Sequence, residues 1–136
     1  MKKIMFNELA RQIAIENSEK KGFNSDVENQ HPAISLMLVV TELSEAVEAD
    51  RNGRWCSFDV GNFLRTETDS DGHPVCVEHF KDAFKTNIKD TFQDEIADAL
   101  IRILDFCGAN NIDIDSHVKA KLEYNRTRPF KHGKKY

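Results

Sequence analysis

The chain has 136 residues, of which 40% are hydrophobic and 31% are charged. This length suits one domain with its own core, and the composition excludes both a disordered acidic tail and a protein whose helices span a membrane. The net charge of −4 hides an asymmetry, because residues 119–136 hold seven basic residues and one acid, which leaves −10 for the first 118. This uneven distribution of charge has two interpretations. The acidic and basic segments are either ordinary solvated surface, or two halves of one site in which carboxylates bind a cation and the basic end binds an anion.

Hydrophobic periodicity predicts two helices in the first half of the chain. The first covers residues 4–20 and is ended by Gly22, and a polar loop follows over 23–31. The second begins at Pro32 and continues to the Asn52-Gly53 pair at residue 52. Residues 53–75 are rich in glycine and turn residues, which predicts a long irregular loop or a short hairpin.

The second half predicts three more helices. A short helix covers 77–88, and a strong one covers 91–107, with Thr91 as a candidate cap and Gly108 as its end. Asp113 or Asp115 caps a last helix that continues to about residue 126. The pattern predicts a single all-α domain over residues 1–136, built as a helix bundle with an insertion at about 53–88 between its central helices.

Each central helix carries a stripe of large apolar side chains, which we expect to form the core. On a helical wheel these residues are Leu36, Val40, Leu43 and Val47 in the second helix, and Ile96, Leu100, Ile103 and Cys107 in the later one.

Two pairs of carboxylates lie beside these stripes rather than on the polar faces. They are Glu42 with Glu45, and Glu95 with Asp98, each spaced three residues apart and so on one face of its helix. Carboxylates in such surroundings become protonated or bind a cation. An all-oxygen set of four suits Mg²⁺, with Mn²⁺ as a substitute.

These acids have two alternative interpretations. They can form structural salt bridges, as Asp98 can with Arg102 four residues later. A di-iron site needs two Glu-x-x-His motifs, and the one present, Glu28 to His31, is followed at once by Pro32, which disfavours that site.

The basic end offers a candidate anion site. Lys121, Asn125 and Arg128 are spaced along one face of the last helix and its exit, and their side chains suit phosphate oxygens and a base edge. Cations at the C-terminus of a helix are also common for purely local reasons. The acidic body disfavours nucleic acid as the partner.

Three cysteines without a metal-binding spacing, in a chain whose start lacks the pattern of a signal peptide, predict a cytoplasmic protein.

Three motifs together resemble a known family. Glu42-x-x-Glu45, Glu95-x-x-Asp98 and Lys121-x-x-x-Asn125-x-x-Arg128 occur in the order seen in MazG-type all-α nucleoside triphosphate pyrophosphohydrolases. Residues 40–46 and 94–101 read like the two central helices of that family, and residues 128–135 resemble an ending found in some members. The sequence departs from the family in the 49 residues between Glu45 and Glu95, which exceed the usual gap.

The resemblance implies an enzyme with a MazG-like bundle. Its substrate would be a ribo- or deoxyribonucleoside triphosphate, which it would hydrolyse between the α- and β-phosphates to the monophosphate and pyrophosphate. The four acids would match the family's Mg²⁺ ligands, with Glu45 as our choice for the catalytic base. Lys121, Asn125 and Arg128 would bind the nucleotide. The family forms dimers or higher oligomers, so a homodimer or homotetramer is expected, and a role in removing surplus or damaged nucleotides is one candidate. The alternatives are a non-catalytic all-α interaction module with structural acid pairs, and a nucleic-acid-associated protein.

Overall fold

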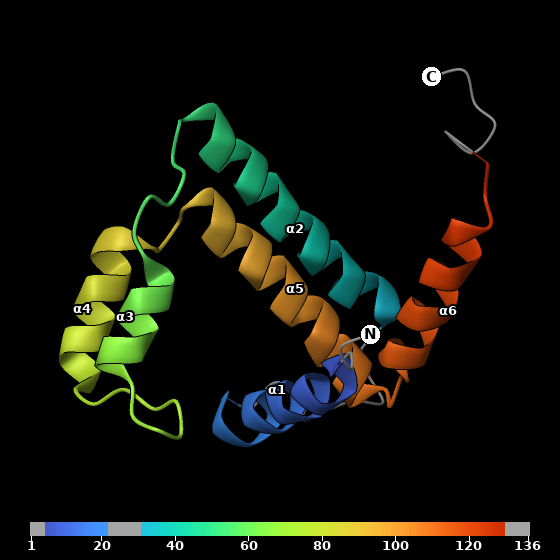
Figure 1. The fold of residues 1–136 in the computed structure, drawn as a ribbon, viewed down its shortest axis with the longest axis horizontal. Coiled ribbons are helices and arrows are strands. Elements are labelled where there is room, and N and C mark those ends of the chain that lie inside the picture. Colours follow the sequence, from blue (N-terminus) through green and yellow to red (C-terminus); the bar gives the residue numbers. More distant parts are fainter. Residues whose placement is uncertain (1–4, 22–30, 130–136) are drawn as a thin grey trace. The chain divides into compact units, whose positions relative to one another are not determined.

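The computed structural model describes residues 5–21 and 31–129, and these residues form six helices and no strand (Figure 1). The expectation of an all-α protein is confirmed. In chain order the helices are α1 (Phe6–Lys21), α2 (Pro32–Arg51), α3 (Val60–Glu67), α4 (Val77–Asn87), α5 (Phe92–Ala109) and α6 (Ile114–Arg126). Among the described residues, no helix has both the length and the apolar character needed to cross a membrane. Gly22, residues 23–30 of the loop predicted over 23–31, and residues 130–135 of the family-like ending lie outside the described residues.

Helix α3 was not predicted. It occupies part of the segment expected to be either an irregular loop or a short hairpin. The hairpin alternative is wrong, since this segment holds only an isolated bridge between Thr68 and Pro74. The side chain of Asp59 caps α3 by accepting a hydrogen bond from the backbone N of Asn62 at 2.9 Å. Phe63 buries its ring and packs against Phe58 and Phe80.

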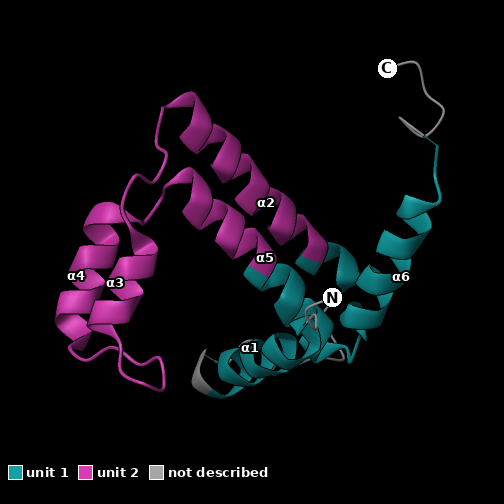
Figure 2. Ribbon diagram, viewed as in Figure 1, with its two compact units in different colours: residues 1–35, 101–136 teal, residues 36–100 magenta. Residues whose placement is uncertain are grey.

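The chain divides into two compact units (Figure 2), residues 1–35 with 101–136, and residues 36–100. In the first unit, Ala10, Leu104 and Cys107 form a core cluster. Of the two candidate caps, Asp113 caps α6. Asp115 instead accepts hydrogen bonds from the backbone N atoms of Phe6 and Asn7, at 2.8 and 3.2 Å, and so caps α1. The expectation of a single domain stays a prediction.

Gly108 does not end α5, contrary to expectation; it lies inside the helix, where α1 comes close to α5. A Cβ atom on Gly108 would be 2.1 Å from the carbonyl oxygen of Ala10 and 2.9 Å from the Cβ of Ala14. Ala10 itself is 1% exposed. Glycine is therefore required here by the close approach of two helix backbones rather than by a turn.

Replacing Gly108 by Ala is expected to destabilise the protein by roughly 3 kcal/mol, because a backbone oxygen must move to admit the new methyl group. The matched control is Gly61→Ala in α3, where the added Cβ would meet its nearest atom at 3.5 Å. That control should gain up to about 1 kcal/mol from helix propensity. Urea unfolding of both variants measures the difference, and equal stabilities would contradict the close packing.

The predicted core stripes are wrong in most positions. Leu36, Val40, Leu43 and Val47 of α2 are each 44–49% exposed, and of the α5 stripe only Cys107 is buried. The buried residues of α2 are Val39, Glu42, Ala46 and Ala49. Small side chains allow two helices to approach closely, so these faces pack within the chain and leave the larger apolar side chains outside.

Candidate metal and anion site

The second unit brings the two acidic helix faces together. Within it, α2 and α5 run side by side in opposite directions (Figure 1), joined near one end by a hydrogen bond from the N of Phe92 to the carbonyl of Arg54, at 2.8 Å. Ala46 and Ala49 of α2 and Ala99 of α5 are almost fully buried. Glu42 and Glu95 are buried on the same faces, at 7% and 5% exposure.

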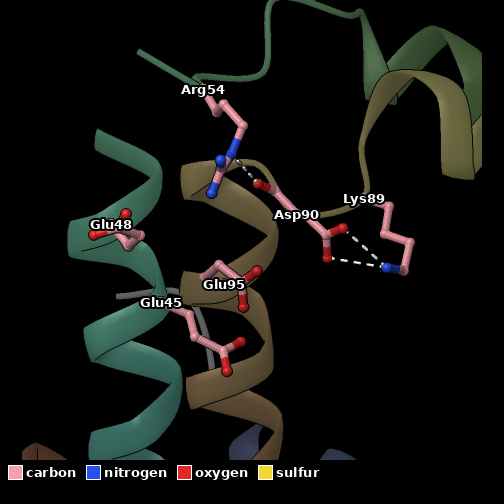
Figure 3. Close-up of a pocket in the computed structure, with 6 residues that line it drawn as sticks. All are labelled: Glu45, Glu48, Arg54, Lys89, Asp90 and Glu95. Atoms are coloured by element: carbon pink, nitrogen blue, oxygen red, sulfur yellow. Dashed lines mark hydrogen bonds and ion pairs between the residues drawn. The ribbon is translucent and has the colours of Figure 1, made fainter. Parts of the chain in front are cut away.

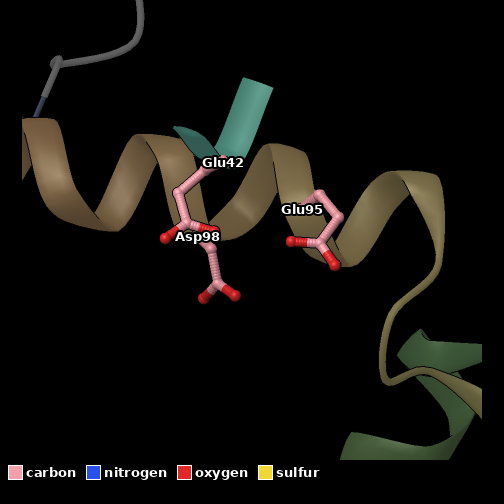
Figure 4. A group of neighbouring side chains, drawn as sticks. All are labelled: Glu42, Glu95 and Asp98. Carbon is pink, nitrogen blue, oxygen red and sulfur yellow. The ribbon is translucent and has the colours of Figure 1, made fainter. Parts of the chain in front are cut away.

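Three of the four predicted acids converge on one point. Glu42, Glu95 and Asp98 each offer a carboxylate oxygen within 4.8 Å of the others (Figure 4). Mg²⁺ bonds oxygen at about 2.1 Å, so opposite ligands are roughly 4.2 Å apart, and a small contraction of the cluster would fit the ion. The donor set, consisting only of carboxylate oxygens, suits a hard divalent cation.

The fourth acid, Glu45, joins the cluster through Glu95. Their side chains share a hydrogen bond, and Figure 3 shows the two carboxylates close together between α2 and α5. Two carboxyl groups can share a hydrogen bond only if one of them holds a proton. A cation can replace that proton.

The pKa of Glu95 is raised from 4.5 to about 7, first by burial and then by the charge and the hydrogen bond of Glu45, with smaller contributions from Asp94 and Asp98. Without a cation, this carboxyl therefore titrates close to neutral pH. Ionising Glu95 beside the other carboxylates is therefore unfavourable without a cation. A bound cation would offset this repulsion, so the site favours cation binding.

A second group of acids was missed by the sequence reasoning. Asp90, Asp94 and Glu95 also offer oxygens within 4.8 Å of one another, so Glu95 belongs to both groups. Asp90 has a φ of 60°, in the left-handed region, and its backbone N donates to the Asp94 carboxylate at 2.9 Å. The signal available in the sequence is the position of Asp94 four residues after Asp90.

A pocket of about 440 Å³ opens beside the cluster (Figure 3). Four carboxylates and two cationic side chains line it: Glu45, Glu48, Arg54, Lys89, Asp90 and Glu95. Arg54 and Lys89 were not predicted as site residues. Each lies three residues from a helix end, Arg54 after α2 and Lys89 before α5, and the antiparallel pairing of these helices brings both to one pocket.

The predicted nucleotide-binding residues lie in the other unit. Lys121 and Asn125 are exposed on α6, where the Lys121 Nζ lies 5.1 Å from the centre of the Tyr124 ring. Arg128 follows the helix, and its backbone N donates to the carbonyl of Asn125 at 3.2 Å. Their assignment as ligands of a nucleotide stays a prediction.

The raised pKa of Glu95 predicts an unusual pH dependence of stability. Between pH 4.5 and 7 the folded chain keeps a proton that the unfolded chain releases, so this contribution is complete below pH 4.5 and is lost as the pH rises through 7. Its size is at most about 3 kcal/mol. Urea unfolding at pH 5 and pH 8 should show that Glu95→Gln removes this loss, because Gln resembles the protonated acid.

The same urea unfolding is repeated with Mg²⁺ present. Mg²⁺ should stabilise the wild-type chain at pH 8, where Glu95 releases its proton easily, and much less at pH 5, where the ion must compete with that proton. The account of Glu95 is wrong if wild type and Glu95→Gln lose equal stability between the two pH values.

Comparison with known proteins assigns neither a family nor a function to the chain. No protein-family model matches the chain, and no curated protein or solved structure is significantly similar to it.

Proposed function

We propose that this chain is a Mg²⁺-dependent nucleotide pyrophosphohydrolase, which cleaves a ribo- or deoxyribonucleoside triphosphate between the α- and β-phosphates to give the monophosphate and pyrophosphate. The observation that carries the proposal is the convergence of Glu42, Glu95 and Asp98, with Glu45 hydrogen-bonded to Glu95, beside an open pocket. The motif resemblance supplies the reaction class. Removal of surplus or damaged nucleotides is the physiological role we propose for it.

The residues fit the ion that the reaction requires. Glu42, Glu95 and Asp98 would hold Mg²⁺, or Mn²⁺ in its place, with Glu45 able to join them. When bound, the ion neutralises charge on the phosphate oxygens and makes the phosphorus more electrophilic.

Glu45 has the position of a general base. Glu45 is exposed and lines the pocket, whereas Glu42 and Glu95 are buried. A carboxylate that faces the pocket can orient a water molecule and accept its proton as the water attacks the phosphorus. We also propose that the nucleotide is bound by Lys121, Asn125 and Arg128.

A homo-oligomer is the second part of the proposal. Of the large apolar side chains of α2 and α5 that are more than 40% exposed, six form one stripe on each helix, namely Leu36, Val40, Leu43, Val47, Ile96 and Leu100. At 100° per residue, each set lies about 110° around its helix from the buried face. Because the two helices are antiparallel, these equal rotations place both sets on one face of the pair, which we call the apolar face.

The apolar face supports self-association. Monomeric proteins rarely expose large continuous apolar surfaces, and exposed apolar residues that gather on one face are typical of an interface. Two copies related by a twofold axis would bury the same face on both chains and form a four-helix arrangement at the contact. We propose a homodimer through this face, or a homotetramer that contains it.

A nucleotide panel tests the proposed activity. The full chain is incubated with each common ribo- and deoxyribonucleoside triphosphate, with Mg²⁺ or with a chelator, and both pyrophosphate and orthophosphate are quantified. The proposal expects Mg²⁺-dependent pyrophosphate from at least one nucleotide. If none of them yields pyrophosphate, the proposal is wrong, and the interaction module with structural acid pairs becomes the better account.

A further inference from the structure

The segment between α2 and α5 contributes two cations to the pocket that holds the acids. Arg54 precedes this segment's helices and Lys89 follows them, and both line the pocket with Glu45 and Glu95. Neither belongs to the three motifs that suggested the function.

Arg54 is held in a fixed place at the mouth of the pocket. Its backbone N donates to the carbonyl of Ala49 and its own carbonyl accepts from Phe92, both at 2.8 Å, so it is tied to α2 and α5. The next residue, Trp55, stacks on Phe92 with ring centres 4.1 Å apart and donates to Asp50 at 2.8 Å. A cation on a fixed backbone loses little freedom when it binds a ligand.

The guanidinium of Arg54 keeps its charge available. Its Nε donates to the backbone carbonyl of Asp90 at 3.3 Å, which orients the group without neutralising it, since the acceptor is uncharged. In Figure 3 the rest of the group lies over the pocket, toward Glu95. The forked, planar guanidinium matches phosphate oxygens with two parallel hydrogen bonds.

Lys89 can move to a new partner at little cost. Its Nζ pairs with the carboxylate of Asp90 at 2.9 Å, and both side chains are more than half exposed. An exposed ion pair of this kind contributes at most about 1 kcal/mol, so a phosphate could displace Asp90 as the partner of Lys89.

The charge balance links anion binding to cation binding. Four carboxylates against two cationic side chains give the lining of the pocket an excess of acidic groups, which repels an anion. One divalent cation held by Glu42, Glu95 and Asp98 would offset two of the negative charges at this site. The two basic residues then become accessible to an anion that also contacts the metal.

We propose that Arg54 and Lys89 form a binding site for the outer phosphates of a polyphosphate anion, and that the site binds this anion only together with a divalent cation. This inference rests on the proposed function, since it assigns the pyrophosphate end of the nucleotide to this pocket.

Inorganic pyrophosphate is the probe, and its binding to the full chain is measured by calorimetry with Mg²⁺ and with a chelator. We expect binding with Mg²⁺ only. Arg54→Gln should weaken it at least about tenfold, and Lys89→Gln at least about threefold, because each removes one charge-assisted contact. Arg65→Gln in α3 and Lys85→Gln in α4 are matched controls that remove one exposed cation outside the pocket, and they should leave the affinity unchanged.

Two further measurements distinguish an anion-binding role of Arg54 from a purely structural role. Mn²⁺ affinity, measured by electron paramagnetic resonance, should stay within about twofold in Arg54→Gln, and Arg54→Lys should recover part of the pyrophosphate affinity. If Arg54→Gln fails to fold, Lys89→Gln decides. Wild-type pyrophosphate affinity in Arg54→Gln, an equal loss in Arg65→Gln, or binding that does not require Mg²⁺ would overturn the inference.

The result is also distinguishable from a failure of the proposed function, because pyrophosphate binding is measured without turnover. A chain that cleaves nucleotides with the same KM in wild type and Arg54→Gln overturns this inference and leaves the enzyme intact. A chain that cleaves none, yet binds pyrophosphate through Arg54, overturns the enzyme and leaves the anion site.

Discussion

Replacing Asp98 by Asn, or Glu45 by Gln, is expected to lower the rate of pyrophosphate release from the best nucleotide substrate at least about 100-fold. Asp98 supplies one of the three convergent oxygens, and Glu45 is the pocket-lining acid that hydrogen-bonds Glu95. An amide keeps the size of each side chain but removes the charge that holds a cation or accepts a proton. Initial rates at saturating Mg²⁺ give the measurement.

Asp82→Asn provides the matched control for these variants. Asp82 is exposed on α4 and belongs to neither acidic group, so its loss should leave the rate within about twofold of wild type. Circular dichroism should show unchanged helical content in every variant. Wild-type rates in both Asp98→Asn and Glu45→Gln would reject the site.

Replacing Leu43 by Glu is expected to convert the proposed homo-oligomer to monomers. Leu43 belongs to the apolar face and is 44% exposed in the single chain, so a charge there leaves the packing of the chain intact. In a dimer, the carboxylate would lose its water against apolar side chains, and association should weaken at least about 100-fold. Sedimentation equilibrium over a range of protein concentrations measures the change.

Thr41→Glu is the matched control for the apolar face. Thr41 lies on the same helix and is exposed, but it faces away from the apolar face, so the same added charge should leave the oligomer unchanged. A wild-type chain that remains monomeric at high concentration would contradict the proposal, as would a Leu43→Glu variant that still associates like the wild type.

Hydrophobic periodicity predicted helices well where large apolar side chains recur, as in α2 and α5, but it missed α3. That helix has eight residues, includes Gly61, and depends on the Asp59 cap and on burial of Phe63 among aromatic side chains. Turn-type residues in a short segment cannot reveal a helix that is stabilised mainly by contacts elsewhere in the chain.

The predicted core was wrong for a physical reason that bears on function. Large apolar residues such as Leu43 and Val47 were expected to pack inside the chain, whereas small residues such as Ala46 and Ala49 fill the contact between α2 and α5. The wheel shows which residues share a face. It does not show whether the same chain or another copy covers that face.

The acids of the candidate site were predictable, whereas the cations beside them were not. Spacing three residues apart placed Glu42 and Glu45 on one face, and the structure joins that face to Glu95 and Asp98. Arg54 reaches the same pocket from a segment without a motif, through hydrogen bonds to two helices that are far apart in sequence. Such a placement follows from tertiary structure alone.

The central claim is that this chain cleaves a nucleotide at the bond between its α- and β-phosphates. Phosphorus NMR of the best substrate of the panel, followed during conversion by the wild-type chain with Mg²⁺, tests it most directly. We predict that signals of the nucleoside monophosphate and of pyrophosphate grow together in equal amounts, and that a chelator stops both. Formation of the nucleoside diphosphate with orthophosphate, or no conversion of any nucleotide, would contradict the claim.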